Sequence, residues 1–146
     1  QAFQAARLLT LIQGFRLLRA ASDTYEWEID GARVARIWRA GCIIRSGMLD
    51  EIAAAFDAQP PMGELLLAPD LAETLLATVP SLRRVVAAAL TAGHAIPAFS
   101  AGLQWFDTIR QGRGTANLIQ AQRDFFGHHG FERVDAEGSH HGPWWT

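Results

Sequence analysis

The chain has 146 residues, of which 49% are hydrophobic and 19% are charged, and this size and composition are typical of one globular domain. Its formal net charge of −2 at pH 7 argues against a nucleic-acid-binding surface, because such surfaces carry a strong basic excess. Apart from the histidines, every basic side chain is an arginine, since the sequence contains no lysine.

Neither a membrane span nor a secretion signal is predicted. No apolar stretch reaches the roughly 18 to 20 residues that a membrane span needs, and the first residues lack a signal-peptide pattern. The single cysteine, Cys42, lies in the apolar run AGCIIRS, which is typical of a buried, reduced thiol. We therefore expect a cytoplasmic protein with no membrane partner.

The first segment is predicted to be a helix that starts at once. Apolar residues recur at steps of three and four in QAFQAARLLTLIQGFRLLRAASD, as they do on the buried face of a helix. No capping residue precedes them, although helices usually begin with one. Because an initiator methionine is also missing, we expect the chain to start inside a helix of a longer protein.

Two further helices are predicted before a proline break. Asp30 can cap a short helix through GARVARIWRA, because its side chain can accept a hydrogen bond from the first turn. After Gly41, apolar spacing predicts a helix from about Cys42 to Asp57. The segment QPPMG then breaks the pattern, since consecutive prolines cannot continue a helix.

The middle of the chain is also predicted to be helical. After the short apolar turn ELLLA, Asp70 can cap LAETLLATV. Pro80 should kink or end that helix, with Ser81 capping a new helix that closes at Gly93. Pro97 suits the first position of the next helix, AFSAGLQWFDTIR.

The last predicted helix carries NLIQAQRDFF and can be capped by Thr115 or Asn117. From Gly127 onward the chain mixes glycine, proline and polar residues with isolated aromatic ones, and no pair of alternating strands is found. The predicted fold class is therefore all-α, with a multi-helix domain over residues 1–127 and an irregular tail over residues 128–146. The tail has too few contiguous apolar residues to fold alone, so we expect it to be mobile or to dock on a partner subunit.

Common catalytic and metal-binding motifs do not occur. The segment GRGTAN superficially resembles a phosphate loop, but it follows a helix instead of a strand. The adjacent pairs His128–His129 and His140–His141 raise the possibility of zinc. However, neighbours on an extended chain point in opposite directions, so each pair offers one ligand at a time. We expect polar tail residues, some of them docked, and no metal site; a zinc-binding tail is the weaker alternative.

Arg123 lacks an anionic partner in the local sequence. On a helix it shares one stripe with Ile119 and Phe126, whereas Asp124 points away from that stripe. An arginine drawn out of water needs an anion, and its planar fork suits phosphate and carboxylate groups because it donates two parallel hydrogen bonds. The partner is expected from elsewhere in the fold, another subunit or a ligand, and a purely structural role is the alternative.

Four long segments follow one another along the chain: YEWEID, ARIWRAGCIIRSGMLDEI, PAFSAGLQWFDTIR and ANLIQAQRDFFGHHGFER. In this order they resemble landmarks of the C-terminal helical domain of the decarboxylating 6-phosphogluconate dehydrogenases, and the resemblance covers essentially the whole chain. It implies part of an enzyme that oxidises 6-phosphogluconate with NADP or NAD and decarboxylates it to ribulose 5-phosphate. It also implies a homodimer in which the C-terminal tail reaches the partner subunit.

The resemblance implies roles for two residues of this chain. In the family, an arginine of the QAQRD motif and a histidine six residues later bind the substrate across the dimer. By position they are Arg123, which would grip the phosphate, and His129, which would hydrogen-bond the sugar phosphate. His128 stands where the family usually has alanine, and Gly130 stands where it has threonine. The resemblance therefore does not decide whether His128 or His129 contacts the substrate.

Other parts of the family pattern are not found in this chain. The nucleotide-binding domain, the KGTGxW signature, the lysine base and the glutamate acid lie upstream in the family, and a chain without lysine cannot supply that base. The ending HHGPWW replaces a His-Thr-x-Trp pattern. We therefore expect no catalytic residue, no bound cofactor and no activity for this chain alone. A stand-alone helical module used only for association is the alternative reading.

Overall fold

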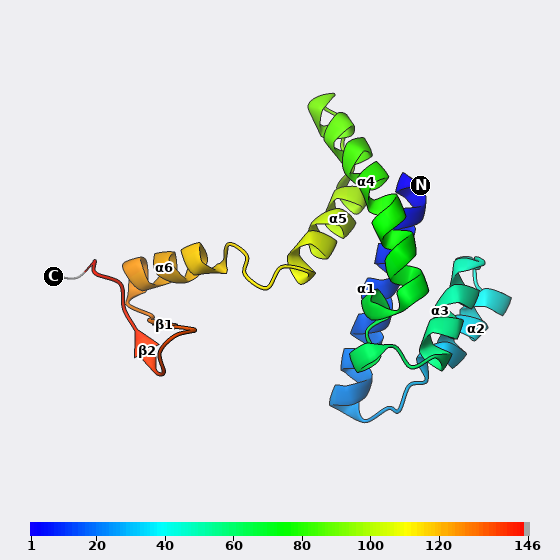
Figure 1. Ribbon diagram of the computed structural model, residues 1–146, viewed down its shortest axis with the longest axis horizontal. Helices are drawn as coiled ribbons and strands as arrows, with labels where there is room; N and C mark the ends of the chain where they lie inside the picture. Colours follow the sequence, from blue (N-terminus) through cyan, green and yellow to red (C-terminus); the bar gives the residue numbers. More distant parts are fainter. Residues whose placement is uncertain (145–146) are drawn as a thin grey trace. The chain divides into compact units, whose positions relative to one another are not determined.

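The computed structural model describes residues 1–144 and is built mainly of helices (Figure 1). The helices are α1 (Ala2–Tyr25), α2 (Gly31–Gly41), α3 (Met48–Asp57), α4 (Pro69–Thr91), α5 (Pro97–Ile109) and α6 (Ala116–Gly127). Two 3-10 turns, η1 (Pro61–Gly63) and η2 (Leu65–Leu67), join α3 to α4. The predicted all-α class is confirmed. The chain divides into two compact units, one up to Phe106 and one from Asp107 on, and each is described by itself.

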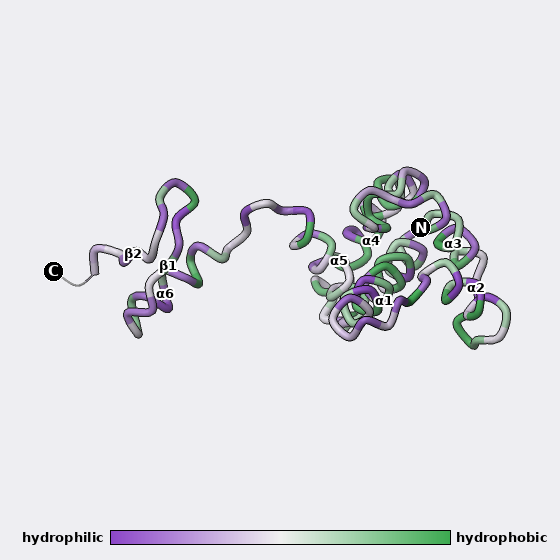
Figure 2. The backbone as a smooth tube through the Cα atoms, turned by 90° about the horizontal axis from the view of Figure 1, so that it is seen from below, coloured by the Kyte–Doolittle hydropathy of each residue, from purple (hydrophilic) through white to green (hydrophobic). Residues whose placement is uncertain are grey.

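The core of the first unit is formed mainly by α1, α3 and α4. Helices α1 and α4 lie side by side, α2 packs against α3 (Figure 1), and hydrophobic residues run along both α1 and α4 (Figure 2). Fully burying one leucine or isoleucine stabilises a fold by about 1.5–3 kcal/mol. The fully buried large apolar residues are Leu8, Leu9, Ile12, Leu49, Ile52, Leu71, Leu75 and Leu82.

Two helix starts agree with the sequence reasoning because local chemistry sets them. The Asp30 carboxylate accepts a hydrogen bond from the backbone N–H of Arg33 at 3.1 Å and caps α2. Helix α5 begins at Pro97, as predicted, where the missing proline N–H leaves no hydrogen bond unmade. No helix within residues 1–144 has both the length and the apolar character to cross a membrane.

Three predicted helix boundaries were wrong. Helix α4 begins at Pro69, ahead of the expected cap Asp70, with Ala68 as its N-cap and no side-chain cap bond. The helix expected from about Cys42 begins only at Met48, because residues 42–47 form turns and Ser46 Oγ accepts from the Met48 N–H at 3.2 Å. Helix α4 continues through Pro80, so this proline does not end the helix and Ser81 does not cap a new one. A proline lacks the N–H that a helix interior needs, but Val79 and Leu82 on either side of it are buried in one core. Packing therefore outweighs the local preference.

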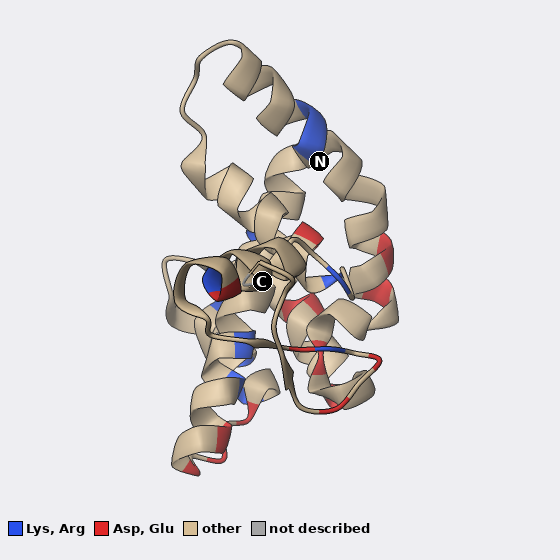
Figure 3. Ribbon diagram, turned by 90° about the vertical axis from the view of Figure 1, so that its left-hand side faces the viewer, with Lys and Arg blue, Asp and Glu red and all other residues tan. Residues whose placement is uncertain are grey.

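The second unit contains α6 and a short hairpin. Strands β1 (Phe131–Glu132) and β2 (Ser139–His140) pair antiparallel, with Phe131 opposite His140. Strands of two residues are too short to give the alternation by which a strand is recognised, so the tail was predicted as irregular throughout. Figure 3 shows acidic and basic residues along the hairpin loop, where Arg133 and Asp135 form an ion pair.

Candidate functional site

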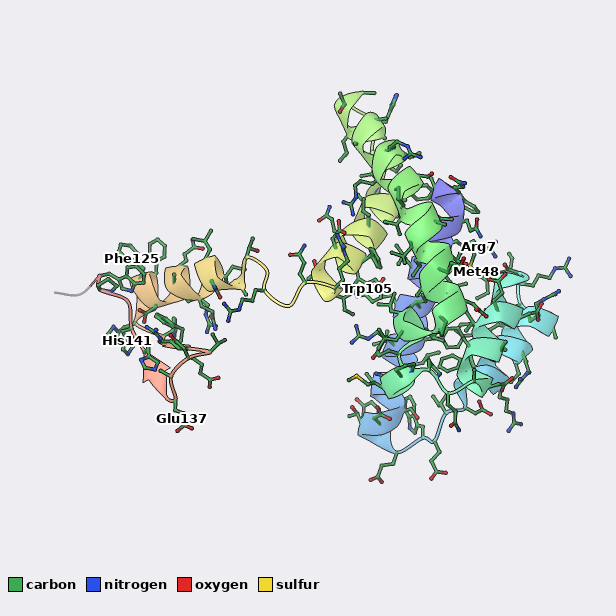
Figure 4. All side chains as sticks on the ribbon, viewed as in Figure 1. Arg7, Met48, Trp105, Phe125, Glu137 and His141 are labelled. Atoms are coloured by element: carbon green, nitrogen blue, oxygen red, sulfur yellow. The ribbon has the colours of Figure 1, made fainter. Side chains whose placement is uncertain are left out.

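Asp124, near the end of α6, is fully buried, and the tail folds around it. Its Oδ1 accepts hydrogen bonds from the Gly130 N–H at 2.9 Å and from His141 Nδ1 at 2.6 Å. Its Oδ2 accepts from the Gly142 N–H at 2.8 Å and from the Trp144 indole N–H at 2.7 Å. We call these five residues the tail latch; His141 of the latch is labelled in Figure 4.

The hydrogen bonds of the tail latch keep Asp124 ionised. Burial by itself raises the pKa of Asp124, because it penalises the charged form. The hydrogen bonds from Gly142, Trp144, His141 and Gly130 lower the pKa by more, so it lies well below its usual range. An ionised carboxylate can only accept, and His141 therefore carries its proton on Nδ1.

A stacked histidine pair adjoins the latch. The rings of His128 and His141 lie 3.7 Å apart between centroids, with their planes within 3° of parallel. His128 follows α6 in the left-handed conformation, with φ of 52°, and its N–H bonds to the Asp124 carbonyl at 2.8 Å. The structure thus brings together one histidine from each adjacent pair of the sequence.

A metal ion fits this arrangement poorly. Asp124, His128 and His141 each offer a ligand atom, and these atoms lie within 4.8 Å of one another. However, both oxygens of Asp124 already accept two hydrogen bonds each. Imidazole nitrogens bind metals in the plane of the ring, so two parallel rings stacked 3.7 Å apart cannot both aim at one ion. The donor set suits a hydrogen-bonded latch and not a coordination site.

Arg123 precedes Asp124 in the sequence and is exposed, because adjacent helical residues face different sides. Its Nη1 donates to Gln120 Oε1 at 3.1 Å. Ile119 and Phe126, on the predicted stripe, are 54% and 76% exposed. The stripe therefore exists as an exposed face that combines apolar side chains with a guanidinium group. Within residues 1–144, this face is not buried.

His129 is exposed in the turn that follows α6. Its ring lies against Gly127, where an added Cβ would stand 2.6 Å from Nε2. The ring of His128 is stacked on His141, and this favours His129 as the member of the pair that can reach a ligand. The structure brings His129 and Arg123 to the same end of α6, and within the described residues no hydrogen bond joins their side chains.

A cavity of about 460 Å³ lies beside α6 within the second unit. Gln120 lines this cavity and also holds Arg123, while Trp144 lines it and also bonds to Asp124. The cavity therefore adjoins both the exposed arginine and the tail latch.

Asp124 is the residue that sequence reasoning missed. Helical spacing placed it off the Arg123 stripe but gave no reason to bury a carboxylate. The available signal was in the tail, where His141 and Trp144 keep the spacing of the His-Thr-x-Trp pattern, and both proved to be donors to Asp124. A buried carboxylate needs such donors, but sequence alone does not show that they return to α6.

Comparisons with known proteins agree over nearly the whole chain. Residues 1–144 match the family described as "6-phosphogluconate dehydrogenase, C-terminal domain". A decarboxylating 6-phosphogluconate dehydrogenase of Synechococcus elongatus is 45% identical over 143 residues, which cover 98% of this chain and 30% of the relative. A chloroplastic relative from Spinacia oleracea is 43% identical over 144 residues, which cover 99% of this chain and 27% of the relative.

A solved structure gives the same result. The Plasmodium falciparum 6-phosphogluconate dehydrogenase has a TM-score of 0.91 and 38% sequence identity, covering 98% of this chain and 31% of that protein. It was determined in its apo form, with its cofactor NADP+ and with its substrate 6-phosphogluconate. The chain thus spans about 30% of the length of the relatives that it matches.

Proposed function

The chain belongs to the 6-phosphogluconate dehydrogenase family, whose C-terminal domain it matches, and we propose that it forms the substrate-binding and dimerisation part of the decarboxylating enzyme. The complete enzyme would oxidise 6-phosphogluconate with NADP or NAD and release ribulose 5-phosphate and carbon dioxide. The family match over residues 1–144 is the observation that carries this proposal.

The reaction divides the work between this chain and the rest of the enzyme. A base takes the proton of the 3-hydroxyl group while the carbon that bears this group loses a hydride. The nicotinamide cofactor, when bound, supplies the hydride acceptor. The resulting β-keto acid loses carbon dioxide, and an acid protonates the enediol that remains. A lysine base must come from outside this chain, because it contains no lysine. The contribution of this chain is to bind and orient the substrate.

Arg123 and His129 are the proposed binding residues. The exposed Arg123 guanidinium, held by Gln120, would donate two parallel hydrogen bonds to the phosphate. His129 would hydrogen-bond the sugar phosphate from the turn after α6. In the proposed homodimer, both residues serve the active site of the partner subunit, and the exposed apolar side chains beside Arg123 would be covered there.

The substitution Arg123→Ala in the full-length enzyme tests this proposal. The KM for 6-phosphogluconate should rise on the order of a hundredfold, because a charge-assisted, bidentate contact is lost. The KM for NADP should stay nearly constant. Arg36→Ala is the matched control, since it removes an exposed arginine that pairs with Asp57. An unchanged KM for 6-phosphogluconate in Arg123→Ala would return Arg123 to a structural role.

A further inference from the structure

We infer that Asp124 is a positioning residue, which fixes His129 for the substrate by tying the tail to the end of α6. The inference rests on the proposed function, and it adds a residue that does not itself reach the substrate. Asp124 is fully buried, so it acts only through the groups that it holds.

The backbone on both sides of His129 is bonded to Asp124. The His128 N–H donates to the Asp124 carbonyl at 2.8 Å, and the Gly130 N–H donates to Asp124 Oδ1 at 2.9 Å. One residue of α6 thus closes the turn through its main chain and its side chain together. The backbone of His129, which lies between the two donors, cannot shift far without loss of one of these bonds.

The returning tail completes the enclosure of the carboxylate. His141, Gly142 and Trp144 supply the three other donors to Asp124, and the His141 ring also covers His128. A buried carboxylate that loses one donor is left partly unsatisfied, which is costly. The tail latch therefore forms as one unit, and the turn that holds His129 is ordered together with it.

Order in this turn matters for substrate binding. A side chain that is already held in its binding position loses less freedom when the ligand arrives, and a small misplacement weakens catalysis strongly. Asp124 lies five positions before His129 in the sequence and yet bonds to both neighbours of that residue. This makes it the residue on which the position of His129 depends.

The first experiment measures the latch without reference to activity. Amide hydrogen exchange at Gly130 and Gly142 is followed by NMR in the 146-residue chain, in Asp124→Asn and in Asp135→Asn. Exchange at both glycines should accelerate at least tenfold in Asp124→Asn, because an amide in place of the carboxylate cannot accept all four bonds. Asp135→Asn makes the same change of charge on an exposed carboxylate of the hairpin and should leave both rates unchanged. Unaltered exchange in Asp124→Asn would overturn the inference.

A milder variant distinguishes a local effect on the latch from general unfolding. Trp144→Phe removes one donor and keeps an aromatic ring in the tail. It should accelerate exchange at Gly142 while amides of the first unit, such as that of Leu82 in α4, keep their rates. Loss of protection across the whole chain in both variants, with no selective effect on the turn, would contradict a latch that acts locally.

The second experiment tests positioning in the full-length enzyme. Asp124→Asn should raise the KM for 6-phosphogluconate about tenfold and leave the KM for NADP within twofold. Because Asp124 acts through His129, the double variant Asp124→Asn/His129→Ala should bind substrate no worse than His129→Ala alone. Losses that multiply would contradict positioning. If the unsubstituted enzyme proved inactive, the proposed function would fail while the exchange measurements still decided the latch.

Discussion

The close contact between Gly142 and Trp144 determines how the tail reaches Asp124. A Cβ added at Gly142 would lie 1.9 Å from Cζ2 of the Trp144 ring, far inside van der Waals contact. The indole therefore occupies the space of a side chain that glycine lacks. This allows the Gly142 N–H and the Trp144 indole N–H to reach the same carboxylate oxygen.

The substitution Gly142→Ala should accordingly remove one of the four hydrogen bonds to the Asp124 carboxylate. The added methyl group displaces the Trp144 ring, so Asp124 Oδ2 loses the indole donor. Amide exchange at Gly142 itself cannot be compared after the change, so the readout is Gly130, whose exchange should accelerate severalfold. Gly112→Ala, at a position with no atom near the new Cβ, should behave as the unsubstituted chain. A normal Gly130 rate in Gly142→Ala would mean that Trp144 is not needed for the latch.

Asp124 should also make the stability of the chain depend on pH in acid. Its pKa is lowered in the folded state, so the ionised carboxylate stabilises the fold. This contribution is fully present above the unfolded pKa of about 4 and is lost as the pH falls towards the folded pKa. The difference in Tm between the unsubstituted chain and Asp124→Asn should be constant above pH 5 and shrink below pH 4. Thermal unfolding followed by circular dichroism from pH 2 to pH 7 measures it, and a difference that widened in acid would be the wrong sign.

At the scale of single elements, neighbouring residues of α4 differ strongly in the exposed fraction of their side chains. Leu75 is 2% exposed and belongs to the core, whereas Leu76 is 75% exposed. Leu75→Ala should lower the free energy of unfolding by about 2–5 kcal/mol, because it leaves a cavity among packed side chains. Leu76→Ala, the same change one residue later, should lower it by less than about 1 kcal/mol. Urea unfolding of both variants tests this, and equal losses would contradict the placement of α4.

The helices were predictable from sequence where their local signals and their packing agree. Asp30 caps α2 and Pro97 starts α5, because both depend on chemistry within one turn. The sequence allowed Pro80 to end α4, but the helix continues because buried residues on both sides of Pro80 pack into one core. The β1–β2 hairpin could not be predicted, since its order comes with the bonds that the tail makes to Asp124 and not from an alternating sequence pattern.

The candidate site was predictable to a smaller extent. Arg123 was recognised from its apolar neighbours, and His129 was assigned to substrate binding only through the family resemblance. Both roles stay predictions until substrate binding is measured. The burial of Asp124 depends on residues six to twenty positions further along the chain. Helical spacing carries no information on whether the tail folds back onto α6.

At the scale of the whole molecule, the proposed donation of Arg123 across a dimer can be tested by complementation. One subunit carries Arg123→Ala, and the other carries a substitution of the upstream lysine base. If Arg123 serves the partner, the mixed dimer contains one intact site and should show about half of the unsubstituted activity. If Arg123 serves its own subunit, both sites are defective, and at a substrate concentration near the KM of the unsubstituted enzyme the mixed dimer should be at least as impaired as the Arg123→Ala homodimer. Each homodimer alone should be inactive or strongly impaired, which is the control.

The chain by itself should not reduce NADP in the presence of 6-phosphogluconate. It has no lysine to act as the base, and it spans about 30% of the length of its relatives. Absorbance at the wavelength of NADPH, followed with the purified 146-residue chain, tests this. Robust turnover would contradict the proposed division of labour. A separate observation concerns the alternative: a start codon directly before Gln1 would favour the stand-alone association module.

The indole of Trp144, one of the five tryptophans of the sequence, can serve as an optical label of the tail. Tryptophan emission responds to charge and hydration near the ring, and this ring donates to a buried carboxylate that remains negative through the physiological range. Release of the tail would place the same ring in water beside no fixed charge. In a variant whose other four tryptophans are replaced by phenylalanine, the fluorescence of this ring can therefore follow docking in real time, without a dye or an added tag.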